Sequence, residues 1–339
     1  MRMGGNVIGL DIGGANLKAA TADGRARSRL FELWKHPDRL GIALRELLNR
    51  WLPSYLAVTM TGELCDCFET KRDGVARILA EIVQAFPETP IAAWSTDGCF
   101  ITIDEANHHP MKVAASNWHA LATFAERIVG DDSALMIDVG STTSDIIPIW
   151  QGRPMPLGRT DPERLRSKEL VYTGFRRTPI CALLQDGIAA EFFATTQDAY
   201  LRLGLIAEDA DDCHTADGRP ATVKNAHARL SRMLGGDPEI TSDDDTHHIA
   251  SKVYAKQRQL LVDAIDAVSR RLPQSPRQVI LFGSGEFLAR AAWSEFSRAR
   301  SASKGEASII SLAERLGPEV STAACAYAVA VLAEESWTS

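Results

Sequence analysis

The chain has 339 residues, of which 45% are hydrophobic and 24% charged, with a formal net charge of −7. This length suffices for about two domains with full cores, and the acidic balance argues against general nucleic-acid binding. No stretch approaches the ~18 apolar residues of a membrane span, we find no signal-peptide pattern, and six scattered cysteines predict a cytoplasmic protein rather than a disulfide scaffold.

Residues 7–18, VIGLDIGGANLK, predict a buried strand that ends in a glycine turn. Gly13 and Gly14 allow the backbone to turn tightly, and the N–H groups of such a turn can bind phosphate oxygens. Asp11 would repel a phosphate unless a divalent cation lay between them, which makes Asp11 a candidate Mg²⁺ ligand. Taken alone the pattern is common, so a purely structural turn is an equal alternative.

The same pattern returns in residues 134–145, ALMIDVGSTTSD. Asp138 corresponds to Asp11 at an offset of 127 residues (138 − 11), and Gly140 and Ser141 correspond to the two glycines. Both copies then run into a second short apolar segment. A repeat at this spacing argues against coincidence and predicts two related halves.

Between the two copies, the apolar spacing alternates between that of helices and that of strands. It predicts helices over 40–52 and 75–86, and strands over 56–60 and 91–94. Such alternation indicates an α/β sheet. The second of these strands runs into Ser95-Thr96-Asp97-Gly98, at the edge where parallel sheets bind ligands.

Ser116 is a candidate N-cap for a helix that runs to Val129. Asn117 would then lie in the first turn of that helix, where anions are favoured. Two interpretations stay open for Asn117: it serves the cap, or it lines a ligand cleft.

Residues 159–179 carry most of the local positive charge. Arg176 and Arg177 lie between Gly174 and Pro179, which suggests a held loop. Planar guanidinium groups suit bidentate contacts with phosphate. A solvated run of charges is an equal alternative.

In the last third of the chain, an acidic run at 243–245 suits the N-terminal end of a long helix over 249–272. Residues 278–285 predict a third strand with a glycine turn, which can admit a flat ring or a phosphate. The Ala- and Val-rich tail over 321–332 predicts a buried helix between two lobes.

Three glycine turns therefore stand in order: DIGG (11–14), DVGS (138–141) and FGSG (282–285). This order resembles the superfamily of sugar kinases, actin and Hsp70. The resemblance implies an α/β fold of two ribonuclease-H-like lobes with an interlobe cleft. Residues 1–130 would form the lobe with the first phosphate motif, and residues 131–339 the lobe with the second phosphate motif and an adenosine-type motif.

Finer matches are TGELCDCF (61–68), SNWHALA (116–122), ELVYTGFRRTP (169–179) and ASKGEASIISLAERLG (302–317). They resemble the hydantoinase/oxoprolinase-related family linked to tetrahydromethanopterin one-carbon transfer, whose archaeal members are similar to an enzyme of methanofuran biosynthesis. The resemblance implies a transferase that joins the phenol of γ-glutamyltyramine to an (aminomethyl)furanmethyl diphosphate and releases diphosphate.

The chain departs from sugar kinases at Ala15-Asn16, where those enzymes usually show Thr, and it lacks a clear Gly-x-Gly-Asp base between the phosphate motifs. ATP is therefore a candidate ligand that is not expected to be required. The alternatives are an ATP-dependent small-molecule kinase or amide hydrolase on the same fold. A nucleotide-sensing regulator ranks last, because repressors on this scaffold usually carry an N-terminal DNA-binding domain. The first strand here begins near residue 6, and we expect no room for such a domain.

For the transferase, we expect Mg²⁺ held by Asp11 and Asp138, and cations such as Lys18, Arg176 and Arg177 to neutralise the leaving group. A phenol of pKa about 10 needs a base, and Asp97, Glu63 and Asp145 stay open for that role. The other expected ligand-binding residues are Gly13, Gly14, Asn16, Asn117, Gly140, Ser141, Thr142, Thr143, Gly283, Ser284 and Gly285. We expect small-molecule substrates, no nucleic-acid or membrane partner, and allow for a homo-oligomer.

Overall fold

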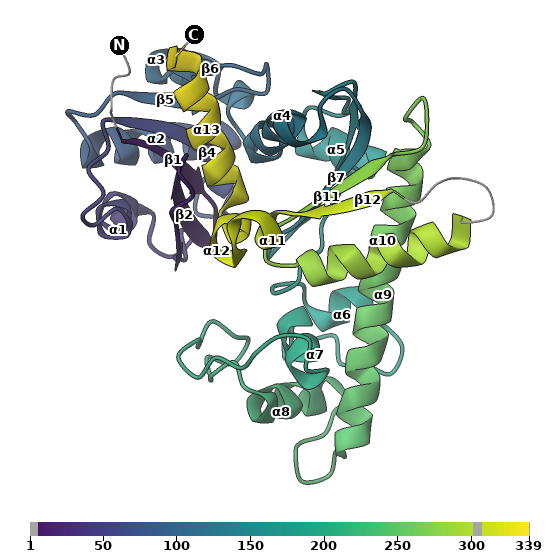
Figure 1. Ribbon diagram of the computed structural model, residues 1–339. Helices are drawn as coiled ribbons and strands as arrows, with labels where there is room; N and C mark the ends of the chain where they lie inside the picture. Colours follow the sequence, from purple (N-terminus) through teal and green to yellow (C-terminus); the bar gives the residue numbers. More distant parts are fainter. Residues whose placement is uncertain (1–5, 301–306, 339) are drawn as a thin grey trace.

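The computed structural model describes residues 6–300 and 307–338, so residues 302–306 of the fourth family-like stretch lie outside the described residues. Two sheets organise two lobes (Figure 1). The first sheet contains β1 (Val7–Ile12), β2 (Asn16–Thr21), β3 (Ala26–Leu30), β4 (Tyr55–Met60), β5 (Ile91–Trp94) and β6 (Phe100–Thr102). The second contains β7 (Ser133–Val139), β8 (Ser144–Trp150), β9 (Arg153–Pro154), β10 (Leu170–Val171), β11 (Gln278–Phe282) and β12 (Ser308–Ser311).

The two sheets repeat one pairing scheme. Their strand orders are β3-β2-β1-β4-β5-β6 and β10-β8-β7-β11-β12, with β9 paired to β8. β1 is antiparallel to β2 and parallel to β4, and β7 is likewise antiparallel to β8 and parallel to β11. This duplication confirms the predicted α/β fold of two ribonuclease-H-like lobes. The division of the chain near residue 130 stays a prediction.

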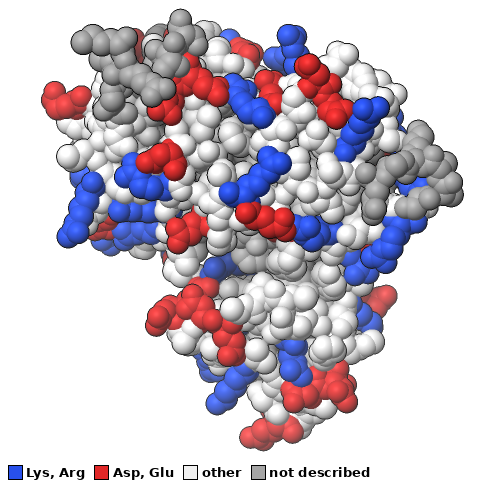
Figure 2. Space-filling model, in the orientation of Figure 1, with Lys and Arg blue, Asp and Glu red and all other residues white. Residues whose placement is uncertain are grey.

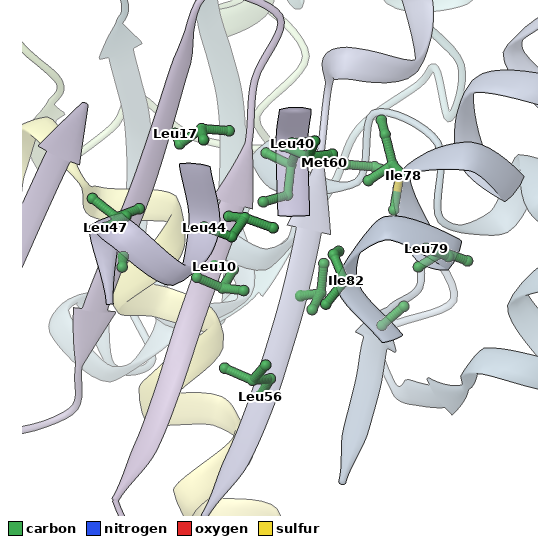
Figure 3. Packing of buried hydrophobic residues seen from close by; sticks show 14 of the residues in the cluster. Leu10, Leu17, Leu40, Leu44, Leu47, Leu56, Met60, Ile78, Leu79 and Ile82 are labelled. Atoms are coloured by element: carbon green, nitrogen blue, oxygen red, sulfur yellow. The ribbon is translucent and has the colours of Figure 1, made fainter. Parts of the chain in front are cut away.

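Two helices cover one face of the first sheet: α1 (Leu40–Leu47) and α2 (Lys71–Ala85). Side chains alternate along a strand, so Leu10 and its neighbours two residues away face these helices. Figure 3 shows the resulting core, in which Leu10 and Leu56 from the strands meet Leu44 and Ile82 from the helices. At β6 the chain turns into α3 (Ile103–His108).

The opposite face of the first sheet is covered by the end of the chain. Helix α13 (Ala324–Thr338) packs against β1, β2 and β4 and against α4 (Asn117–Val129). It lies between the lobes (Figure 1), as the Ala-rich tail predicts. A Cβ at Gly9 would lie 1.9 Å from the carbonyl oxygen of Ala326, so β1 and α13 touch backbone to backbone.

The second sheet packs one face on α9 (Asp243–Ser269) and α10 (Glu286–Arg300). A group of helices projects from this lobe beside the N-terminal half of α9 (Figure 1); they are α6 (Ile180–Leu183), α7 (Thr196–Arg202) and α8 (Val223–Met233). Among the described residues, the remaining α-helices are α5 (Asp161–Ser167), α11 (Leu312–Leu316) and α12 (Pro318–Thr322), and three short 3-10 helices span Pro37–Arg39, Gly62–Leu64 and Pro110–Lys112.

Two local predictions need correction. Ser116 precedes α4 but does not cap it through its side chain, because its hydroxyl contacts Thr59 Oγ1 at 3.0 Å. The long helix spans Asp243–Ser269 instead of 249–272, because Ser242 and Asp245 form a capping box; the acidic run at 243–245 forms its first turn, as predicted. The basic stretch 159–179 contains α5, with a capping box from Thr160 and Glu163. Arg176 and Arg177 lie in a turn whose N–H groups donate to the Ser141 carbonyl, which confirms the predicted held loop.

On the face shown in Figure 2, basic and acidic side chains are interspersed, and neither sign forms a continuous patch there. Within the described ranges, no helix has both the length and the apolar character that a bilayer span requires.

Candidate active site

A cavity of about 560 Å³ lies where the two glycine turns face each other. It brings together most of the predicted site residues, although they come from both lobes. Those that line it are Asp11, Gly13, Gly14, Asn16, Lys18, Asn117, Asp138, Gly140, Ser141, Thr142, Thr143, Asp145 and Arg177. Of the two interpretations of Asn117, the structure favours the one in which it lines the cleft.

The two glycine turns have the same construction. The Gly13 N–H donates to the Asn16 carbonyl at 3.0 Å, and the Gly140 N–H donates to the Thr143 carbonyl at 2.9 Å. The Asn16 side chain then reaches Ser141 Oγ at 3.4 Å, so the turns meet across the cleft. Each turn joins two antiparallel strands, which explains why each motif runs into a second apolar segment.

Asp11 and Lys18 lie directly opposite each other on β1 and β2, with their charged atoms 3.7 Å apart. Asp11 is only 4% exposed, and its Oδ1 has no hydrogen-bond partner among the described residues. Burial raises the pKa of Asp11, and Lys18 opposes that rise. Burial alone would lower the pKa of Lys18, but Asp11, Cys325 and Asp138 outweigh it and raise that pKa. Lys18 therefore stays a cation.

In the second lobe, the positions that correspond to Asp11 and Lys18 both hold an aspartate. Asp145 lies opposite Asp138 on β8 and β7. Burial, reinforced by Asp145, raises the pKa of Asp138 to about 7, although the side chain borders the open cavity. Burial also raises the pKa of Asp145, and the adjoining Arg164 opposes that rise.

Arg164 is the centre of a chain of charges between the lobes. Only 2% of this residue is exposed; it pairs with Asp145 and with Asp161, the latter at 3.7 Å, and its guanidinium lies 4.1 Å from the ring centre of Trp118. Asp161 in turn contacts Lys71 of the first lobe at 2.8 Å. This series of ion pairs fixes one wall of the cavity.

Several predicted residues lie elsewhere. Asp97 does not line the cavity; it pairs with Lys112 at 2.7 Å and with Arg159 at 3.4 Å. The Arg176 guanidinium is committed to Asp212 at 2.5 Å. Glu63 is buried behind the cavity wall, where burial raises its pKa to about 7 and Lys71 opposes that rise.

The third glycine turn packs against the second instead of lining the cavity. A Cβ at Gly283 would lie 2.3 Å from Asp138 Oδ1, and one at Gly285 would lie 2.4 Å from the Val139 side chain. Ser284 Oγ donates to Thr322 Oγ1 at 3.2 Å. The glycines here permit close packing beside Asp138, and the adenosine-type contact stays a prediction.

Among the residues of the cavity wall that sequence reasoning missed are Trp34, Asp161, Arg164, Tyr172 and Cys325. One signal was available: the Thr160–Glu163 capping box predicts the helix that carries Asp161 and Arg164. Trp34, Tyr172 and Cys325 show no comparable local pattern.

Comparison with known proteins identifies the family. The sequence profile of the hydantoinase/oxoprolinase family matches residues 54–331. The chain belongs to the hydantoinase/oxoprolinase family. A curated protein of Methanocaldococcus jannaschii, (4-{4-[2-(gamma-L-glutamylamino)ethyl]phenoxymethyl}furan-2-yl)methanamine synthase, is 34% identical over 340 residues, covering 97% of this chain and 98% of its own. The protein of that name from Methanococcus vannielii is 34% identical over 210 residues, or 60% of this chain and 91% of its own.

Solved structures place this hydantoinase/oxoprolinase family member among sugar kinases in fold. A ROK family glucokinase from Streptomyces griseus, solved with glucose and AMPPNP, aligns with a TM-score of 0.51 at 14% identity, covering 97% of this chain and 99% of its own. Nucleotide-free acetone carboxylase gives the same TM-score and identity over 89% of this chain and 46% of its own. At such low identity the likeness concerns the fold alone.

The cavity of this hydantoinase/oxoprolinase family member fits Mg²⁺ only in combination with ligand oxygens. Within residues 6–300 and 307–338, no group of three or more His, Cys, Asp or Glu side chains could hold a metal ion. Mg²⁺, however, is commonly held by one or two carboxylates, with waters and substrate phosphates completing its shell. The unpartnered Oδ1 of Asp11, beside two phosphate-type turns, suits that mode.

Proposed function

We propose that this protein forms the aryl ether of a methanofuran-type cofactor precursor, joining the phenol of γ-glutamyltyramine to an (aminomethyl)furanmethyl diphosphate. The observation that carries the proposal is the match along nearly the whole chain, at 34% identity, to a synthase whose named product contains a phenoxymethylfuran. The cavity adds support, because two phosphate-type turns meet there beside Lys18 and Arg177.

In this reaction the CH₂–O bond to diphosphate breaks, and the oxygen keeps the electron pair. The furan ring stabilises positive charge on the CH₂ carbon, and the phenol oxygen then forms the new C–O bond. Lys18 and Arg177 would neutralise charge on the departing diphosphate, since preorganised cations in a dry cavity act strongly on developing charge. The backbone N–H groups of the two turns would orient its oxygens.

The proton of the phenol needs an acceptor inside the cavity. Of the three bases left open by the sequence, only Asp145 lines the cavity, and Arg164 already pairs with it. Asp138 also lines the cavity, and its pKa of about 7 matches a general base at neutral pH. We therefore assign proton removal to Asp138.

With Asp138 as the base, Asp11 would be the protein ligand that holds Mg²⁺, together with oxygens of the diphosphate. When bound, the ion would supply charge neutralisation for the leaving group. Lys18, 3.7 Å from Asp11, would keep that carboxylate oriented toward the turns.

The test is turnover by purified protein with Mg²⁺ and both substrates in the absence of ATP. We expect the ether product by mass spectrometry and one diphosphate released for each ether formed. Strict dependence on ATP would contradict the proposal and favour a kinase or ligase, and calorimetric titration of ATP with and without the second substrate would identify it.

A further inference from the structure

Each glycine turn has a second segment of chain bound along it. In the first lobe, the residues after β3 attach to the first turn: Phe31 N–H donates to the Ala15 carbonyl at 3.0 Å, and Leu33 N–H to that of Gly14 at 2.9 Å. These bonds fix where the next residue, Trp34, leaves the turn.

The second lobe repeats this arrangement with the loop after β10. Phe175 N–H donates to the Gly140 carbonyl at 3.0 Å, and Arg177 N–H to that of Ser141 at 2.9 Å. Gly174 packs so tightly here that a Cβ would lie 2.4 Å from the Ser141 carbonyl carbon. The position of Arg177 is therefore tied to that of the second turn.

The two bound segments meet across the cavity. The Arg177 guanidinium lies 4.6 Å from the ring centre of Trp34, and both side chains line the cavity. The other cations of the cavity wall have carboxylate partners: Lys18 has Asp11, and Arg164 has Asp145. In the described part of the chain, no carboxylate forms a salt bridge with Arg177, so its charge is available to a ligand.

We propose that Trp34 is a positioning residue that holds Arg177 for a diphosphate group reaching both glycine turns. The inference rests on the proposed function, because it takes the ligand to be an organic diphosphate. A guanidinium is planar, weakly hydrated and stacks on aromatic faces, whereas a lysine ammonium is a compact, strongly hydrated charge on a flexible stem. An indole beneath Arg177 therefore orients its N–H donors toward the anion before the ligand arrives.

The test is a double-mutant cycle on the binding of inorganic diphosphate, measured by calorimetry in the presence of Mg²⁺. Trp34→Ala and Arg177→Ala should each weaken binding at least tenfold, and the double variant should bind no more weakly than Arg177→Ala alone. Trp34→Phe, which keeps an aromatic face, should stay within threefold of the parent. Arg177→Lys should fall in between.

Arg27→Ala is a matched control, because Arg27 lies 4.4 Å from the ring centre of Trp51 and neither of them lines the cavity. It should leave diphosphate binding unchanged. An unchanged dissociation constant in Trp34→Ala, strictly additive losses in the cycle, or no binding of diphosphate by the parent would overturn the positioning role.

The cycle also separates this inference from the proposed function. Coupled losses of diphosphate binding in a protein that makes no ether from the two substrates would leave the positioning role standing and refute the reaction. Ether formation together with strictly additive losses of diphosphate binding would support the reaction and refute the positioning role.

Discussion

Lys18 and Asp145 occupy the same position in the two halves of the molecule, yet they carry opposite charges. Each lies on the second strand of its sheet, opposite an aspartate that precedes a glycine turn: Lys18 opposite Asp11, and Asp145 opposite Asp138. The first lobe thus pairs its acid with a neighbouring lysine. The second lobe places two acids together, and Arg164 forms an ion pair with one of them, Asp145. The asymmetry gives the duplicated turns different roles.

Lys18→Met should lower kcat/KM by ~10²–10³-fold, a typical loss when a preorganised charge-stabilising group is removed. If Lys18 served only to neutralise Asp11, Lys18→Met would cost no further activity in an Asp11→Asn background. We expect a further loss of kcat/KM there, because Lys18 also acts on the diphosphate. Steady-state kinetics on the single and double variants distinguish the two cases.

The pH profile should identify Asp138 as the base. Its pKa is raised to about 7, and a base acts only when ionised, so kcat/KM should be maximal above pH 7 and fall about tenfold per unit below it. Asp138→Asn should abolish this limb and most of the rate. Asp97→Asn changes a carboxylate that lies outside the cavity, so it should keep the fall in kcat/KM below pH 7. Loss of that pH dependence in Asp97→Asn would refute our assignment.

Glu63→Gln should stabilise the protein at alkaline pH. Burial raises the pKa of Glu63 from 4.5 to about 7, so the folded state holds this proton more tightly than the unfolded chain. The resulting stabilisation is complete below about pH 4.5 and is lost as the pH rises through 7. At pH 8 the variant should therefore unfold with a free energy on the order of 3 kcal/mol higher than the parent.

Urea titrations at pH 5 and pH 8 measure this effect, which should nearly vanish at the lower pH. Glu105→Gln should instead lower the stability of the protein at pH 8, because hydrogen bonds from the Thr102 backbone and side chain lower the pKa of Glu105. Equal stability of Glu63→Gln and the parent at pH 8 would show that Glu63 is not held as the acid.

Gly9→Ala should destabilise the fold strongly, by about 3 kcal/mol or more, since its Cβ meets backbone that cannot move aside. The added carbon would lie 1.9 Å from the Ala326 carbonyl oxygen and 2.8 Å from Ala330 N. Gly187→Ala is the control, because Gly187 has a φ of +70° and open space around it, so it reports backbone strain alone. Similar melting temperatures for the two variants would contradict the close contact.

The glycine turns and their acids could be predicted from the sequence because they are local and occur twice. A strand, an aspartate and a glycine turn within a dozen residues need no distant partner to be recognised. The repeat then implied two sheets of one design, which the pairing of β1 with β2 and β4, and of β7 with β8 and β11, confirms.

The partners of charged groups could not be predicted in this way. Arg176 and Arg177 are neighbours in one loop, yet Asp212 takes the first and Trp34 packs against the second. Asp97 lies just after a strand and Asp11 near the end of one, but Lys112 and Arg159 hold Asp97 outside the cavity. Such contacts join residues far apart in the sequence, and only the folded chain decides between them.

The contact between β1 and α13 sets an order of events during synthesis. The first strand is translated about 300 residues (324 − 12) before the helix that covers its inner face. Until then, a nascent chain must carry the apolar face around Val7 and Ala57 without its cover from Val329 and Leu332. The first lobe can therefore complete its packing only after α13 has been translated, so the chain needs protection from aggregation or an early docking of its second half.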